Sequence, residues 1–242
     1  LYLLEILPAE WIVCLNNEEK EDLKKIILKK YKNLAEFNKK YSLDKNYLSG
    51  GKQIKVGKFR EILKDLDIYE EWKTKILKYG RSKAGESLMN FKIIPELAYF
   101  IGFVYGDGHI KIDKKHSLIQ VIQSNKKLKQ INKLKEIFKK FSNKKLKEYT
   151  RKKYKSIIKK REVKSESVIL YSSSNLLAYI CDFFTKDNLS NILLLNNECI
   201  KAFIAGCMDS DGCISIKNYK KKKKNYKIFP ANLTYFFLKT KC

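Results

Sequence analysis

Two stretches of this chain place a small residue at every fourth position of an apolar segment and then end on an aspartate. They are LAYFIGFVYGDG (97–108) and KAFIAGCMDSDG (201–212), the second 104 positions after the first. A spacing of four puts the small residues on one stripe of a helix. Glycine in a helix costs about 1 kcal/mol relative to alanine, so the stripes need a reason. They let two helix backbones approach closely and predict an interface at Ala98, Gly102, Ala202 and Gly206.

Each stripe is followed by an acid, Asp107 in the first copy and Asp211 in the second. We expect both carboxylates to emerge side by side at one end of the helix pair. Two close carboxylates repel each other unless a proton or a cation lies between them. Oxygen ligands without a nearby His or Cys favour Mg²⁺ or a similar hard ion. Mere helix packing is the competing explanation of the stripes, but it does not account for the repeated aspartate.

The charge of the chain points to a polyanionic partner. The net charge is +26 over 242 residues, and such a field attracts nucleic acid first; a skewed, lysine-rich genome is the alternative explanation. Six cysteines without a C-x-x-C pair, beside two histidines, argue against zinc and for reduced thiols. No apolar stretch is long enough to span a bilayer. These features predict a cytoplasmic protein without a membrane partner, an organelle being the alternative location.

The first 80 residues predict a helical domain, because apolar residues follow helix spacing over 20–68. Within it, LAEFNKKYSLDKNYLSGG (34–51) predicts a short helix over 34–40, a tight turn at 41–43 and a second short helix from Asp44. The stretch resembles the helix-turn-helix motif of DNA-binding regulators, with Ser42 where that motif usually has glycine; an ordinary helical hairpin is the equal alternative. A helix-turn-helix would direct four side chains to the major groove: Lys45, Asn46, Tyr47 and Ser49.

The remaining pattern predicts an α+β fold. Residues 81–92 are polar and contain glycine, which predicts a linker. A helix from Pro95 to Gly106 is followed by strands over 110–113 and 118–123, a helix over 126–141, strands over 145–155 and 163–172, and a helix over 175–184. This αββαββα unit spans 93–196, with one sheet face covered by helices and the other rich in Lys, Arg, Gln and Tyr. Residues 197–242 predict a second unit that is incomplete.

The two repeated motifs, FIGFVYGDG (100–108) and IAGCMDSDG (204–212), resemble the signature motifs of LAGLIDADG homing endonucleases. The resemblance covers roughly residues 93–240 and implies a sequence-specific endonuclease that hydrolyses phosphodiester bonds of double-stranded DNA with Mg²⁺ or Mn²⁺. In that family the last acid of each motif binds the metal, which implies Asp107 and Asp211 here. Backbone carbonyls at Gly106 and Ser210 would help, and Gln123, late in the second strand, would order the water network.

The family's sheets form a saddle on the DNA major groove. The resemblance therefore implies DNA contacts from outward-facing strand residues, namely Lys111, Gln120, Tyr149, Arg151 and Lys153. The sequence departs from the family at the sixth motif position, which is Tyr105 in one copy and Asp209 in the other. The basic residue that the family often carries near its fourth strand has no clear equivalent around Ser172–Ser174.

The short second copy bears on the expected activity. We expect this chain alone to be a weak or inactive nuclease, unless a partner chain or a dimer completes the second half. The alternative function on the same scaffold is a non-cleaving DNA- or RNA-binding protein, such as an intron maturase, with intron RNA as partner, or a regulator. Both aspartates are retained, which favours the endonuclease.

Overall fold

A computed structural model of the chain describes residues 1–43, 48, 53–81, 85–113, 116–152, 154–156, 161–163, 166–185 and 189–211. The structure combines helices with antiparallel sheets, as expected for the α+β class. The predicted contacts Lys45, Asn46, Tyr47, Ser49 and Lys153 lie outside the described residues, as does most of the second unit from 212 onwards. Within the described ranges, no helix combines the length and the apolar character needed to cross a membrane.

The central unit begins with helix α6 (Pro95–Asp107), which leads directly into β5 (Gly108–Ile112) and β6 (Ser117–Ser124). Helix α7 (Leu128–Lys139) and strand β7 (Lys147–Arg151) follow, then the hairpin of β8 (Tyr154–Ser156) and β9 (Arg161–Val163), and finally β10 (Ser167–Ser172) and α8 (Asn175–Phe184). A 3₁₀ segment, η1 (Leu189–Leu194), connects α8 to α9 (Asn197–Ser210). The four long strands form one antiparallel sheet in the order β5-β6-β10-β7.

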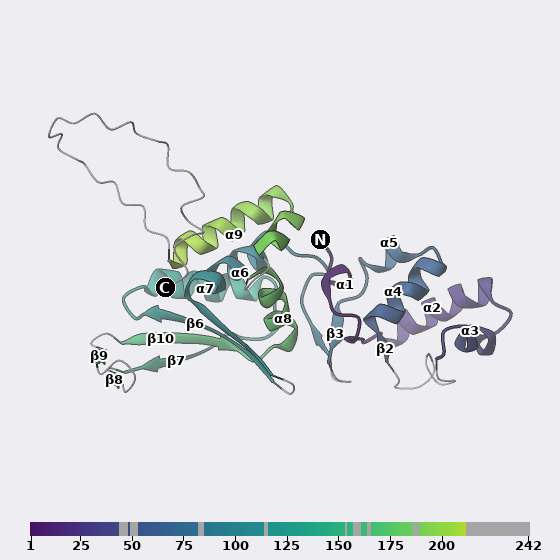
Figure 1. Cartoon of the computed structure of the whole chain (residues 1–242), viewed down its shortest axis with the longest axis horizontal. Coiled ribbons are helices and arrows are strands. Elements are labelled where there is room, and N and C mark those ends of the chain that lie inside the picture. The colour runs from purple at the N-terminus through teal and green to yellow at the C-terminus, as the bar shows by residue number, and fades with distance from the viewer. Residues whose placement is uncertain are drawn as a thin grey trace, which may run out of the picture. The chain divides into compact units, whose positions relative to one another are not determined.

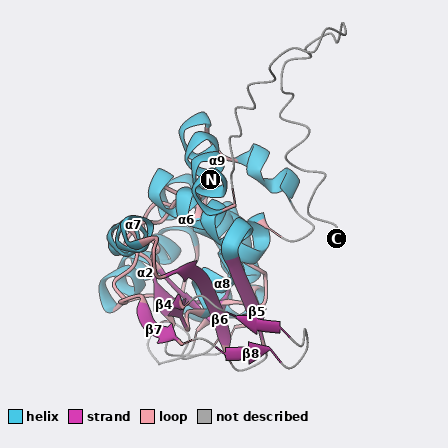
Figure 2. Cartoon of the chain, turned by 90° about the vertical axis from the view of Figure 1, so that its left-hand side faces the viewer, coloured by secondary structure: helices cyan, strands magenta, loops and turns pink. Residues whose placement is uncertain are grey.

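The sheet has two distinct faces, because neighbouring residues of a strand point to opposite sides. Ile110 pairs with Ile119, and Val121 pairs with Leu170; these side chains belong to the apolar core on the side of α6, α7 and α8 (Figure 1). Figure 2 shows the strands of this sheet below that helical layer. The alternate residues of each strand face the other way and form the outer face.

The N-terminal region contains more than the helices that the sequence predicts. Its helices are α1 (Leu3–Ile6), α2 (Asn17–Lys30), α3 (Leu34–Lys40), α4 (Val56–Asp65) and α5 (Tyr69–Trp72). Four short strands, β1 (Ile12–Val13), β2 (Ile54–Lys55), β3 (Lys78–Gly80) and β4 (Glu86–Ser87), form a second sheet in the order β2-β1-β3-β4. Strands of two or three residues are too short to show an alternating pattern, which is why the purely helical expectation missed them.

The turn after α3 is the one that the sequence predicts at 41–43. Ser42 has a positive φ of 53°, the left-handed conformation that usually requires glycine. The amide of Leu43 donates to the carbonyl of Asn38 at 2.8 Å, and the amide of Ser42 donates to that of Lys39 at 3.3 Å. This pair of bonds closes the helix in a Schellman motif. Ser42 therefore adopts the conformation of the turn glycine that it replaces in the helix-turn-helix pattern.

The segment 81–92, which we expected to be a linker, does not separate two domains in the structure. Residues Leu1–Gly212 form one compact unit, and strand β4 lies inside the expected linker. The Glu86 carboxylate accepts hydrogen bonds from the Ser174 hydroxyl at 2.5 Å and from the backbone amides of Asn175 and Leu176 at 3.1 and 3.2 Å. The rings of Trp11 and of Tyr179 on α8 also pack together, with centroids 5.4 Å apart. A polar, glycine-containing segment looks like a linker in sequence, but here its acid satisfies the free amides at the start of a helix.

Replacing Glu86 with alanine is expected to lower the free energy of unfolding by about 1–2 kcal/mol, because three donors at the start of α8 lose their acceptor. Urea denaturation of the wild type and Glu86→Ala measures the difference. Glu61→Ala is the matched control, since the Glu61 side chain is 56% exposed and pairs with Lys58 inside one helix. Equal stabilities of the two variants would contradict the capping role.

Candidate active site

Helices α6 and α9 are in direct backbone contact along the predicted small-residue stripes. A Cβ atom added to Gly102 would lie 2.8 Å from the carbonyl carbon of Phe203, and one added to Gly206 would lie 2.8 Å from the backbone nitrogen of Phe103. Real Cβ atoms do not approach other atoms this closely. Ala98 is fully buried, and Ala202 is half-buried. The interface that the repeat predicts is therefore present in the structure.

Helix α6 is buried on nearly all sides. Its residues from Leu97 to Val104 form an unbroken buried run, because α9 covers one side and the sheet with α7 and α8 covers the other. A helix that is apolar all round is expected to be buried in this way. The burial fixes α6 up to Val104, three residues before Asp107.

The two motif acids meet at the ends of these helices. A Cβ at Gly106 would clash with the side chain of Ser210, the residue before Asp211. Burial raises the pKa of Asp107, and the neighbouring Asp211 carboxyl raises it further by a hydrogen bond and by its charge. The Gln123 amide, which donates a hydrogen bond to Asp107 Oδ2, and the Lys127 ammonium lower this pKa by less. The structure thus brings Asp107, Asp211 and Gln123 together.

Glycine also sets the place where Asp107 leaves the helix. Gly108 is the C-cap of α6 and the first residue of β5, and its amide donates to the carbonyl of Val104. A Cβ at this position would lie 2.6 Å from the Val104 Cα atom. Any side chain there would push helix and strand apart. The chain therefore turns from helix to strand without a loop and leaves Asp107 at the junction, near Gln123 on the next strand.

The polar Gln123 lies on the core side of β6. Its side chain is 2% exposed although its neighbours on that face, Ile119 and Val121, are apolar. A buried amide needs hydrogen-bond partners, and Asp107 provides one. The backbone partner of Gln123 across the sheet is Val168. The sheet register thus fixes the backbone position of Gln123, and the hydrogen bond to Asp107 orients its side chain.

Sequence reasoning missed Lys127, the exposed N-cap residue of α7. Its charge lowers the pKa of Asp107, so an ammonium group stands near the acidic pair. The sequence held no signal for this contact, because it depends on how the turn after β6 leads into α7.

The donor set at the site fits a hard divalent cation. The two carboxyl groups face each other, which is unfavourable for two anions without a cation between them. Among the described residues, no three His, Cys, Asp or Glu side chains gather closely enough to hold a metal. Magnesium often binds through one or two carboxylates and keeps waters or substrate phosphates as its other ligands. The Asp107–Asp211 pair therefore fits magnesium without a third protein acid.

Four of the five strand residues predicted to contact DNA share the outer face of the sheet. In the observed register Gln120 lies opposite His109 and Tyr171, and Tyr171 lies opposite Lys147. Alternation along the strands adds the rest, so that the outer face consists of His109, Lys111, Leu118, Gln120, Ile122, Ser124, Lys147, Tyr149, Arg151, Ser167, Ile169 and Tyr171. Lys111, Gln120, Tyr149 and Arg151 are the four predicted members.

The outer face combines charge with aromatic surface. Lys111 and His109 are exposed, and the Tyr149 side chain is 48% exposed. The rings of Tyr149 and Tyr171 meet edge to face with centroids 6.0 Å apart, beside the buried Ile169 that pairs with Tyr149. Cationic and aromatic side chains on one regular surface are typical of nucleic-acid binding.

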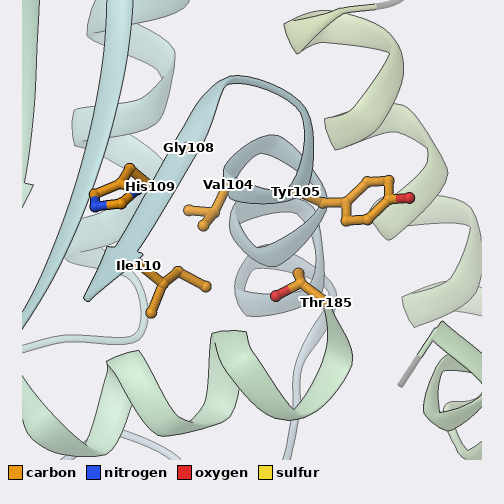
Figure 3. A pocket seen from close by; sticks show the side chains of 6 residues that line it. All are labelled: Val104, Tyr105, Gly108, His109, Ile110 and Thr185. Carbon is orange, nitrogen blue, oxygen red and sulfur yellow. The ribbon is translucent and has the colours of Figure 1, made fainter. Parts of the chain in front are cut away.

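A cavity of about 220 Å³ lies beside the junction of α6 and β5 and is lined by Val104, Tyr105, Gly108, His109, Ile110 and Thr185 (Figure 3). Figure 3 shows Tyr105 directed toward α9. The lining residues include no acid, so the paired carboxylates lie outside this cavity. The cavity is therefore separate from the acidic pair.

Comparisons with known proteins give a similarity to solved structures but no match to a family. No protein-family model matches the chain, and no curated protein matches it. Among solved structures, the chain is similar to the homing endonuclease I-WcaI bound to its DNA recognition sequence. The match has a TM-score of 0.35 and 18% sequence identity, and it covers 48% of this chain and 50% of that chain. It therefore spans only half of the homing endonuclease.

Gly102→Ala is expected to destabilise the protein by about 1–3 kcal/mol, because the added methyl group would meet the Phe203 backbone. Helix propensity alone predicts the opposite sign, a gain of about 1 kcal/mol. Urea denaturation decides between them. Ala205→Gly, at an exposed position of α9, is the control and should show only the propensity cost. A stabilised Gly102→Ala variant would rule out the close backbone contact.

Proposed function

We propose that this chain is a metal-dependent DNA endonuclease of the LAGLIDADG homing type. The observation that carries the proposal is the meeting of Asp107 and Asp211 at the ends of two helices in backbone contact. Packing alone explains the small residues, but it does not explain why a second carboxyl group, that of Asp211, lies beside Asp107. A cation between them removes the repulsion.

Each residue of the site has a role in this proposal. Asp107 and Asp211 hold Mg²⁺ or Mn²⁺, and the backbone carbonyls of Gly106 and Ser210 assist. Bound there, the ion supplies Lewis-acid stabilisation of phosphate oxygens and a more acidic water. Gln123 holds Asp107 in place and offers hydrogen bonds to water. Lys127, whose charge acts on Asp107, would favour a phosphate bound near this acid.

The outer face of the sheet is the proposed DNA-binding surface. Lys111, Lys147 and Arg151 can neutralise backbone phosphates, which gives affinity that falls as salt rises. Gln120 can pair with a base edge in the major groove, and Tyr149 offers an aromatic ring. The charge of +26 on the whole chain supports DNA as the partner.

Asp107→Asn is expected to abolish cleavage and to leave salt-sensitive DNA binding intact or slightly tighter, because the acid holds metal while the lysines neutralise phosphate. The full chain is incubated with Mg²⁺ and a randomised duplex library, and cleaved ends are sequenced. Binding to the same library is measured by retention on a filter.

Asp22→Asn is the matched control for the lost charge, since Asp22 lies on α2 and its side chain is 48% exposed. It should cut like the wild type. Equal cutting by Asp107→Asn and the wild type would show that the site is assigned wrongly. Because the chain alone is expected to be a weak nuclease, an absence of cutting counts against the endonuclease only together with a metal result. DNA binding without cutting in every form, with no Mn²⁺ binding that depends on Asp107, would contradict the endonuclease and favour a non-cleaving DNA- or RNA-binding protein.

A further inference from the structure

A polar cluster on one side of the helix pair joins three helices close to Asp211. The Tyr99 hydroxyl of α6 donates to Asp209 Oδ2 of α9 at 2.5 Å. Lys133 of α7 places its Nζ atom 2.7 Å from the same oxygen and 4.5 Å from the centre of the Tyr99 ring. The Gln130 amide of α7 donates to the backbone carbonyl of Asp209 at 2.6 Å. We call Tyr99, Gln130, Lys133 and Asp209 the α9 clamp.

The internal repeat shows that the clamp is specific to one side. The repeat relates Tyr99 to Phe203 and Tyr105 to Asp209. The contact that matches Tyr99–Asp209 is therefore Phe203–Tyr105, where two rings meet with centroids 6.1 Å apart. One contact between the helices is ionic and hydrogen-bonded, and its counterpart is aromatic. An aromatic contact is thus sufficient to pack α6 on α9 at this position. The polar Tyr99–Asp209 contact therefore needs an explanation other than packing.

The clamp acts at the last turn of α9, where backbone carbonyl groups need partners from outside the helix. The last carbonyls of a helix have no partner inside the helix, and the helix ends at Ser210, one residue before the acid. Gln130 binds one of these carbonyls, and Lys133 brings a cation to the negative end of the helix dipole. The position of Asp211 relative to Asp107 then depends on α7 as well as on the glycine contacts.

We propose that the α9 clamp is a positioning device for the metal site, in which Lys133 and Tyr99 hold the end of α9 so that Asp211 stays beside Asp107, where both would bind a cation. The inference rests on the proposed function. Residues that orient metal ligands from behind typically change metal affinity by about 10–100-fold when they are replaced. Lys133 and Tyr99 touch no reacting atom and act through Asp209.

The test is a Mn²⁺ titration of the full chain, in which free Mn²⁺ is followed by electron paramagnetic resonance. Lys133→Met keeps the apolar stem and removes the ammonium, and it is expected to weaken Mn²⁺ binding at least about tenfold. Simple electrostatics predicts the opposite sign, since loss of a nearby positive charge strengthens cation binding. Lys133→Arg keeps the cation and should restore affinity.

Two further variants keep the test decisive. Tyr99→Phe removes one hydroxyl, recreates the aromatic side chain of the matching position, and should weaken binding in the same direction. Lys129→Met, an exposed lysine of the same helix, should bind like the wild type. Unchanged affinity in both Lys133→Met and Tyr99→Phe would overturn the inference and leave the metal site standing. Mn²⁺ binding that Asp107→Asn does not alter would overturn the proposed function and the inference with it.

Discussion

The backbone contact between α6 and α9 is the constraint on which the rest of the structure depends. Gly102 and Gly206 leave no room for a Cβ atom, and each lies against the backbone of the other helix. Two helices at this distance must end close together. The aspartates that follow the last small residues are then neighbours, and the pKa of Asp107 is raised first by burial and then by the Asp211 carboxyl.

The C-terminal ends of α6 and α9 are held in place by different contacts. Asp107 is held by the chain itself, because Gly108 turns α6 directly into the edge strand β5 and Gln123 reaches the acid from β6. Asp211 is held through two side chains of α7, Gln130 and Lys133, which bind the neighbouring Asp209. The two repeated acids are thus held by different contacts. The sequence already differs between the two repeats at this position, which is Tyr105 in the first and Asp209 in the second.

The sequence predicted the features that depend on local pattern. The stripes of Gly102 and Gly206 predicted the helix contact, and the period-two pattern of LIQVIQ (118–123) predicted the strand that is β6. The same reasoning failed where a feature depends on distant partners. Glu86 looked like part of a linker, because nothing in its neighbours reveals that it caps α8. Lys127 and Lys133 looked like two of many solvated lysines, because only the placement of α7 brings them to the acids.

The most direct test of this account asks whether the two aspartates form one cation site. Mn²⁺ binding is measured by equilibrium titration for the wild type, Asp107→Asn, Asp211→Asn and the double variant. A shared site predicts that either single substitution removes the same high-affinity site and that the double variant loses nothing more, because residues in contact are not additive. Two independent sites, with each single variant keeping half of the bound metal, would contradict it.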